Sequence, residues 1–217
     1  MRYRLVIFDW DGTLMDSEAR IVACMQAAAR DAEWGELRAE AVSDIIGLGL
    51  PEAIARMCPG IGADQAERLR QHYARHFVAA EAEPLSFFPG VEAGVATLRE
   101  RPGTRLAVAT GKSRRGLDRV FAESGSGAWF DASRTADETR SKPHPLMLEE
   151  LLDELEVSAD EAVMVGDTEY DLEMARALSM DRVAMTYGVH APERLAASRP
   201  TFTTDRFPEL VEWLIGR

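Results

Sequence analysis

The sequence predicts an α/β fold: a doubly wound parallel sheet with a small all-helical cap domain inserted after the first strand. Short apolar runs, the first at residues 5–8, have the unbroken hydrophobicity of strands that are buried on both faces of a parallel sheet. From Pro84 onward such runs alternate with amphipathic helical segments, which is the pattern of consecutive βαβ units. Residues 16–83 are helical in pattern and contain no convincing strand.

We therefore expect an α/β core made of residues 1–15 and 84–217 and a helical cap made of residues 16–83. In the cap, one helix should follow Asp16 and Ser17, which can cap a helix start. The further cap helices are expected at 38–46, 51–57 and 64–80.

The core elements follow from the same periodicities, with apolar runs as strands and amphipathic segments as helices. Strands are expected at 105–110, 129–131, 162–165 and 182–185, with an edge strand at 201–203. Helices are expected at 91–101, 113–124, 145–155, 170–178 and 207–215.

Composition limits the classes of partner. Hydrophobic residues make up 46% of the chain, enough for a packed core. The 25 basic and 37 acidic residues give a net charge of −12, which argues against nucleic acid and anionic membranes as partners. Two cysteines indicate no disulfide framework, and no apolar run reaches transmembrane length. We expect a soluble, cytoplasmic protein that acts on a small molecule as a monomer or a homodimer.

Two carboxylates follow the first strand. Asp9 and Asp11 are two residues apart, so both can point into one site, and Gly12 lets the backbone approach a ligand. Like charges held this close call for a cation, and Mg²⁺ prefers carboxylate oxygens. Taken alone, the two residues could equally be ordinary turn residues.

A second motif ends the strand expected at 105–110. Thr110, Gly111 and Lys112 follow an apolar run and precede a helix start, where a hydroxyl and backbone N–H groups can bind a phosphate oxygen. The alternative is a simple strand-to-helix turn in which Ser113 caps the helix.

A third motif is Lys142, which lies in a segment stiffened by Pro143 and Pro145. A cation fixed in this way can offset the charge of a phosphoryl group, of about −2. The alternative is a solvated loop lysine before a helix.

A fourth motif follows the strand expected at 162–165. Asp167 stands at the strand end, as Asp9 does, and Asp171 is four residues further on. Asp171 could instead form a capping box with Thr168.

These four motifs in this order resemble the haloacid dehalogenase (HAD) superfamily, over essentially the whole chain, in its phosphoglycolate phosphatase-like branch with a helical cap. The resemblance implies that Asp9 is the nucleophile and that Asp11 is the acid and base. It also implies that Mg²⁺ is held by Asp9, the backbone carbonyl of Asp11, and Asp167. Asp171 would support the metal, directly or through water.

The resemblance further implies that Thr110, Gly111 and Lys142 bind the phosphoryl group. The expected function is a Mg²⁺-dependent phosphatase for a small, phosphoglycolate-like phosphomonoester. A phosphomutase of the β-phosphoglucomutase type and a non-catalytic phosphometabolite-binding protein are the alternatives. The segment 46–54 lacks Lys, Arg and His, which disfavours the mutase because a mutase must grip a second phosphate.

Specificity is expected from the cap loop and from Lys112. Gly47, Leu48 and Gly49 could close over the site and exclude water. The two glycines could equally do no more than end a helix and form a turn. Lys112 could reach the leaving group of the substrate.

Overall fold

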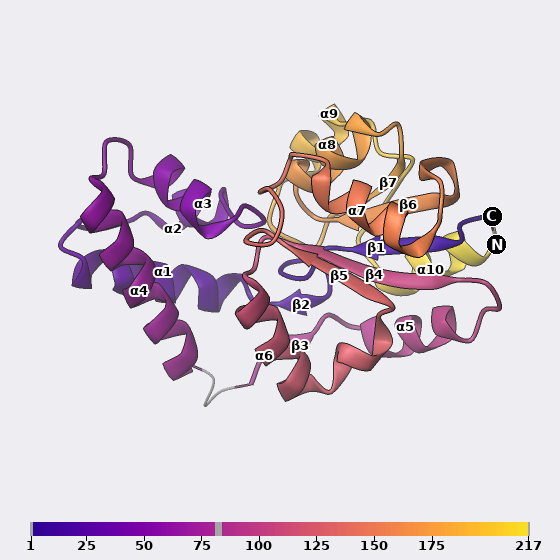
Figure 1. Ribbon diagram of the computed structural model, residues 1–217, viewed down its shortest axis with the longest axis horizontal. Helices are drawn as coiled ribbons and strands as arrows, with labels where there is room; N and C mark the ends of the chain where they lie inside the picture. The colour runs from indigo at the N-terminus through magenta and orange to yellow at the C-terminus, as the bar shows by residue number, and fades with distance from the viewer. Residues whose placement is uncertain (1, 81–83, 217) are drawn as a thin grey trace.

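The computed structural model describes residues 2–80 and 84–216 and contains a six-stranded parallel sheet. The strand order is β5-β4-β1-β6-β7-β8, with β1 in the interior beside β4 and β6 (Figure 1). The strands are β1 (Leu5–Phe8), β4 (Arg105–Thr110), β5 (Ala132–Thr135), β6 (Ala162–Gly166), β7 (Asp181–Met185) and β8 (Phe202–Thr204). Because the pairs are parallel, the carboxyl ends of β1, β4 and β6 meet at one edge of the sheet.

Helices cover both faces of the sheet, which confirms the predicted doubly wound architecture (Figure 1). Val6 and Phe8 of β1 belong to the apolar cluster on one face, whereas Leu5 and Ile7 belong to the cluster on the other. The first cluster includes α5 (Val91–Arg99), α6 (Arg114–Ser124) and α10 (Phe207–Ile215). The second includes α7 (Leu146–Leu155) and α8 (Glu169–Ala177).

Four further helices, which follow β1 in the chain and precede α5, gather at one end of the molecule, on the left of Figure 1. They are α1 (Glu18–Asp31), α2 (Ala39–Ser43), α3 (Leu50–Met57) and α4 (Ala63–Ala79). Met25, Ile54 and Leu69 lie in an apolar cluster that these helices share. We propose the division into a core of 1–15 and 84–217 and a cap of 16–83, of which residues 81–83 lie outside the described part.

A two-stranded antiparallel ribbon lies where the chain leaves and re-enters the core. It consists of β2 (Met15–Asp16) and β3 (Ser86–Phe87), with Met15 opposite Phe87. The prediction of no strand in the segment 16–83 is therefore wrong at Asp16. Two-residue strands are too short to show an alternating pattern, and their pairing joins distant parts of the chain.

The prediction of a strand at 129–131 is also wrong. Residues Ser126–Trp129 form a short 3-10 helix, and the strand is β5, three residues later. Phe130 is apolar because its ring packs on Phe121 and Trp10, with centroids 5.7 and 6.4 Å apart. Trp129 and Phe130 are therefore apolar because they pack in the core, and not because they form a strand. The actual strand, β5, is only partly buried and has a more polar sequence.

One helix was not expected at all, and one is shorter than expected. Helix α9 (Pro192–Ala197) packs through Leu195 against Leu172 and Ala184. Helix α2 ends at Ser43, and turns follow it as far as residue 47. No helix in the described residues is long and apolar enough to cross a membrane.

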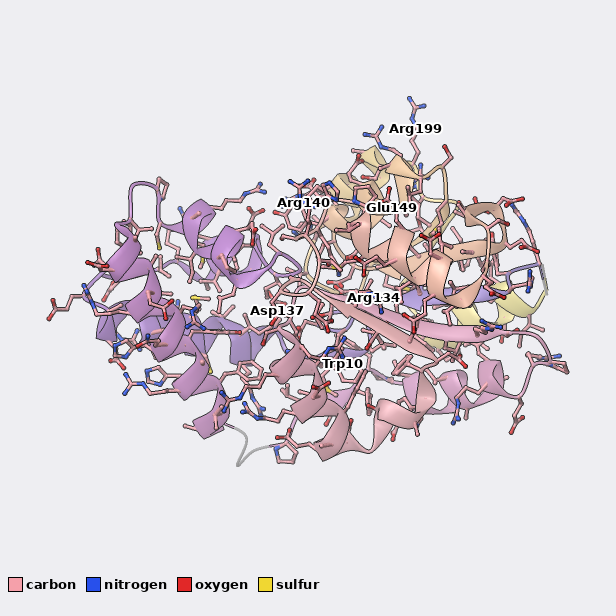
Figure 2. The ribbon with its side chains drawn as sticks, viewed as in Figure 1. Trp10, Arg134, Asp137, Arg140, Glu149 and Arg199 are labelled. Atoms are coloured by element: carbon pink, nitrogen blue, oxygen red, sulfur yellow. The ribbon has the colours of Figure 1, made fainter. Side chains whose placement is uncertain are left out.

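Trp10 separates the two acids of the first motif and points away from them into the core. Figure 2 labels it beneath the sheet, and its side chain is fully buried against Phe87 and Phe121, with centroids 5.9 and 5.3 Å away. Side chains alternate in direction along this segment. Because Phe8 and Trp10 point into one apolar cluster, Asp9 and Asp11 point the other way.

Candidate active site

Three strands deliver polar side chains to the same edge of the sheet. Asp9 follows β1, Thr110 ends β4, and Asp167 follows β6, and all three are buried. Lys142 reaches this edge from the loop that precedes α7. The four sequence motifs thus converge in space, as the resemblance requires.

Lys142 is the ammonium at the centre of the cluster. It is 2% exposed, and its Nζ lies 2.7 Å from Asp9 Oδ1 and 2.6 Å from Asp171 Oδ1. Burial alone would lower the pKa of Lys142, but the charges of Asp171 and Asp9 raise it above its ordinary value. The ammonium therefore stays charged, and the alternative of a solvated loop lysine is wrong.

Asp167 is held by two donors that the sequence does not reveal. Thr13 Oγ1 donates to its Oδ1 at 2.6 Å, and the backbone N–H of Val189 donates to its Oδ2 at 2.8 Å. Burial and the charge of Asp171 raise the pKa of Asp167 to about 7. Gly12, at φ +83°, lies so close that a Cβ there would strike the carboxylate.

Asp171 forms the capping box that the sequence offered as an alternative, and its second oxygen also faces the site. Its Oδ2 accepts from the backbone N–H of Thr168 at 3.1 Å and from Thr168 Oγ1 at 2.7 Å, which completes a capping box for α8. Its Oδ1 faces Lys142 instead. One oxygen fixes the helix start, so the other is held rigidly at the site.

The acidic cluster has the chemistry of a divalent metal site. Carboxylate oxygens of Asp9, Asp167 and Asp171 lie within 4.8 Å of one another. Asp9 Oδ2 is buried and has no hydrogen-bond partner among the described residues. Burial and the charge of Asp171 raise the pKa of Asp9 well above its ordinary value. Three hard oxygen donors with a surplus of negative charge around one ammonium fit a cation such as Mg²⁺.

Asp11 stands outside that cluster and has its own partners. Ser17 Oγ donates to Asp11 Oδ1 at 2.6 Å, and Lys112 Nζ lies 3.0 Å from Asp11 Oδ2. The expectation that Ser17 caps α1 through its side chain is wrong, because the hydroxyl is used here. No sequence signal distinguishes this role from capping, since both place a serine before a helix.

The second motif is held by a hydrogen bond within its own turn and lies against the cap loop. Thr110 Oγ1 accepts from the backbone N–H of Lys112 at 3.2 Å. A side chain at Gly111 would strike the carbonyl oxygens of Gly47 and Leu48. Ser113 caps α6, as the simpler alternative had it, by accepting from the backbone N–H of Gly116 at 3.2 Å.

The cap loop contacts the core at the second motif, through Gly111, and beside the third motif, through Ser141. Gly47 has φ +99°, and the backbone N–H of Gly49 donates to Ser141 Oγ at 2.8 Å. A cleft of about 760 Å³ lies between cap and core, and Asp137, labelled in Figure 2 where the two meet, is part of its wall. Of the predicted site residues, those that line the cleft are Asp9, Asp11, Gly47, Leu48, Gly111 and Lys112. Those that do not line it are Gly49, Thr110, Lys142, Asp167 and Asp171.

Comparison with known families and curated proteins gives consistent matches. The family model described as haloacid dehalogenase-like hydrolase matches residues 6–185. "Probable phosphatase IndB" of Dickeya dadantii is 35% identical over 95% of this chain and 91% of that protein. "Phosphoglycolate phosphatase" of Rhodospirillum rubrum is 32% identical over 97% of this chain and 90% of that protein.

Solved structures share the fold at lower identity. A crystal structure described as a predicted phosphoglycolate phosphatase from Haemophilus somnus matches with a TM-score of 0.87 at 21% identity, covering 99% of each chain. Together, these matches confirm the predicted resemblance and the prediction of an enzyme of the phosphoric monoester hydrolase class.

Proposed function

Because the chain belongs to the haloacid dehalogenase-like hydrolase family, we propose that it is a Mg²⁺-dependent phosphatase of a small phosphomonoester metabolite. The observation that carries this proposal is the position of Lys142, whose Nζ is within 2.7 Å of Asp9 and within 2.6 Å of Asp171. A fixed cation beside a buried carboxylate can draw in a phosphoryl group and hold it in line for attack.

In the proposed reaction, a carboxylate oxygen of Asp9 attacks phosphorus and the bond from phosphorus to the ester oxygen breaks. Asp11 donates a proton to that leaving oxygen. Asp11, now ionised, takes a proton from water as the water attacks the phosphoaspartate, and inorganic phosphate leaves with Asp9 regenerated. Splitting the hydrolysis into two steps lowers each barrier.

The remaining residues bind and neutralise charge. Asp9, Asp167 and the backbone carbonyl of Asp11 would hold Mg²⁺, with Asp171 in support. When bound, the ion supplies positive charge to the phosphoryl oxygens. Thr110 and the backbone N–H groups near Gly111 would hold the same oxygens, and Lys142 would balance their charge. The uncatalysed reaction is slow enough to need acceleration of up to about 10²¹.

Location in the cytoplasm, independence of nucleic acid and membranes, and a monomeric or homodimeric state are further parts of this proposal. Phosphoglycolate is the reference substrate, because several curated relatives are named phosphoglycolate phosphatase. The phosphomutase alternative predicts transfer of the phosphoryl group to a second hydroxyl of the substrate, whereas the phosphatase transfers it to water.

The test is Asp9→Asn, assayed by phosphate release from p-nitrophenyl phosphate with Mg²⁺ present. Turnover should be abolished, and mass spectrometry of acid-quenched protein should detect phosphorylation of the wild-type peptide that contains Asp9 and none in the variant. Asp205→Asn, at an exposed aspartate on the core surface, is the matched control. Retained turnover by Asp9→Asn would refute the nucleophile assignment, and an isomerised bisphosphate without net phosphate release would favour the mutase.

A further inference from the structure

The cleft above the two acids of the first motif is much larger than the reference substrate needs. Its volume of about 760 Å³ lies well inside the range of about 300–1,000 Å³ that accommodates drug-sized ligands. Asp9 and Asp11 form part of its wall, so the cleft is continuous with the reacting atoms. A two-carbon acid esterified to phosphate would leave most of this volume to water.

The cap side of the cleft is mainly apolar. Helix α1 contributes Ile21 and Met25, and helix α4 contributes Tyr73, Phe77 and Val78. The rings of Tyr73 and Phe77 are neighbours, with centroids 5.7 Å apart and planes tilted by 45°. Val78 is 42% exposed and is the one large hydrophobic side chain among the described residues that is exposed. A cleft wall formed mostly by apolar and aromatic side chains indicates a ligand with an apolar body.

The aromatic wall begins at the proposed proton donor. Lys112 Nζ lies 3.0 Å from Asp11 Oδ2 and 4.9 Å from the centroid of Phe77. Burial raises the pKa of Tyr73, and the charge of Asp11 raises it further, so the phenol remains neutral. The leaving group takes its proton from Asp11 and therefore lies beside these two rings.

Two of the cations on the cleft wall are already engaged by carboxylates of the protein. Lys112 pairs with Asp11, and Arg70 donates to both oxygens of Glu67 at 2.6 and 2.7 Å. Arg115, exposed at the start of α6, also lines the cleft and can receive a polar edge at the far end of a longer group.

We propose that the physiological substrate is a phosphomonoester whose leaving group has an aromatic or similarly flat apolar body, packed against Tyr73 and Phe77. The inference rests on the proposed phosphatase function and specifies its substrate class. Apolar burial is worth about 25 cal/mol per Å², so an aromatic body of this kind should strengthen transition-state binding appreciably.

The experiment compares esters whose leaving alcohols have similar acidity, so that intrinsic reactivity does not obscure binding. Ethyl phosphate, 2-phenylethyl phosphate and 2-(2-naphthyl)ethyl phosphate form this series, and phosphoglycolate is assayed beside them with Mg²⁺. We expect kcat/KM to rise along the series, with the naphthyl ester about 10- to 100-fold above ethyl phosphate and above phosphoglycolate.

Two variants test the wall itself. Val78→Asp places a charge beside the apolar body at an exposed position that tolerates substitution, and it should lower the naphthyl-to-ethyl ratio several-fold. Arg68→Gln, at an exposed position on α4 away from the cleft wall, changes the net charge by the same amount and is the matched control. Phe77→Ala should lower the same ratio by removing a ring, and Phe77→Leu should retain part of it.

The outcomes separate the two proposals. If neither the panel nor p-nitrophenyl phosphate is hydrolysed, the phosphatase proposal fails and this inference fails with it. If p-nitrophenyl phosphate alone is hydrolysed, the phosphatase stands and this inference is refuted. If phosphoglycolate or ethyl phosphate is turned over as efficiently as the naphthyl ester, the phosphatase stands and the aromatic substrate class is refuted. A naphthyl preference that neither Val78→Asp nor Phe77→Ala reduces would also refute it, because the wall would then not bind the leaving group.

Discussion

Ser17 Oγ donates a 2.6 Å hydrogen bond to Asp11 Oδ1, and both side chains are buried. The hydroxyl thereby fixes the rotamer of the proposed acid and base. Ser17→Ala removes a hydrogen bond to a charged group, a class worth about 1.5–3 kcal/mol. We expect kcat to fall by about 10- to 100-fold, with a smaller change in KM, in steady-state assays.

Ser17→Thr keeps the hydroxyl and should recover part of this loss. Ser158→Ala, which removes an exposed hydroxyl that bonds to Glu161, is the control. A Ser17→Ala variant with lowered thermal stability but wild-type kcat would show that the serine only supports the fold.

Gly111 should tolerate no side chain while the cap loop is in place. Its Cβ would meet the carbonyl oxygens of Gly47 and Leu48, so Gly111→Ala must push this loop away from the site. We expect KM to rise and kcat to fall, by about tenfold in kcat/KM, with hydrogen exchange accelerated in residues 46–50. Gly62→Ala is the matched control, because nothing lies within 4 Å of its Cβ position. Unchanged exchange in Gly111→Ala would contradict a loop that rests on this glycine.

Metal removal should make stability depend on pH through Asp167. In the unfolded chain an aspartate titrates near about 3.9, whereas burial and the charge of Asp171 raise the pKa of Asp167 to about 7 in the fold. The folded state therefore holds this proton more tightly. Its contribution is full below about pH 4 and is lost as pH rises through about 7, by up to about 4 kcal/mol.

Urea unfolding in EDTA between about pH 5 and pH 8 measures this loss. Asp167→Asn should flatten the decline because an amide does not titrate, and added Mg²⁺ should restore stability to the wild type at the alkaline end. Equal slopes for the two proteins would contradict the assignment.

Arg194 links the segment after α2 to the start of α8, beside the acidic cluster. Its guanidinium binds Asp44, which follows α2, and lies 2.5 Å from Glu169 Oε1 at the start of α8. These side chains are 28–41% exposed, so the coupling between Arg194 and Asp44 should be about 0.2–1 kcal/mol. A double-mutant cycle of Arg194→Met and Asp44→Asn in kcat/KM measures it.

Arg206→Met, which breaks a surface pair with Glu209 on the far side of the core, is the control for loss of an arginine. If the effects of Arg194→Met and Asp44→Asn simply add, the ion pair does not hold the cap.

The core of the fold could be predicted because its signals are local. The apolar runs of β1, β4 and β6 and the periodic faces of α7 and α10 are visible within a few residues. The strand at 129–131 and the helix α9 could not be predicted in this way. Phe130 is apolar because of Trp10 and Phe121, and the position of Leu195 depends on Leu172 and Ala184.

In the candidate site, the residues that follow strands could be predicted from the sequence, and the groups that orient them could not. A carboxylate or hydroxyl directly after a buried strand is a local pattern, and parallel pairing then carries Asp9, Thr110 and Asp167 to one edge. The donors that orient these groups, Thr13 and the backbone of Val189, give no local signal. Their roles depend on how separate segments pack.

The sequence by itself determined the alternation of the main strands and helices along the chain and the polar residues that follow β1, β4 and β6, because backbone periodicity is set by neighbours along the chain. The tertiary structure decided that Ser17 serves Asp11 rather than α1, that Asp171 divides its oxygens between Thr168 and Lys142, and that an apolar cleft lies above Asp9. Those outcomes depend on contacts between segments distant in the sequence, where many pairings are compatible with one local pattern and packing selects among them.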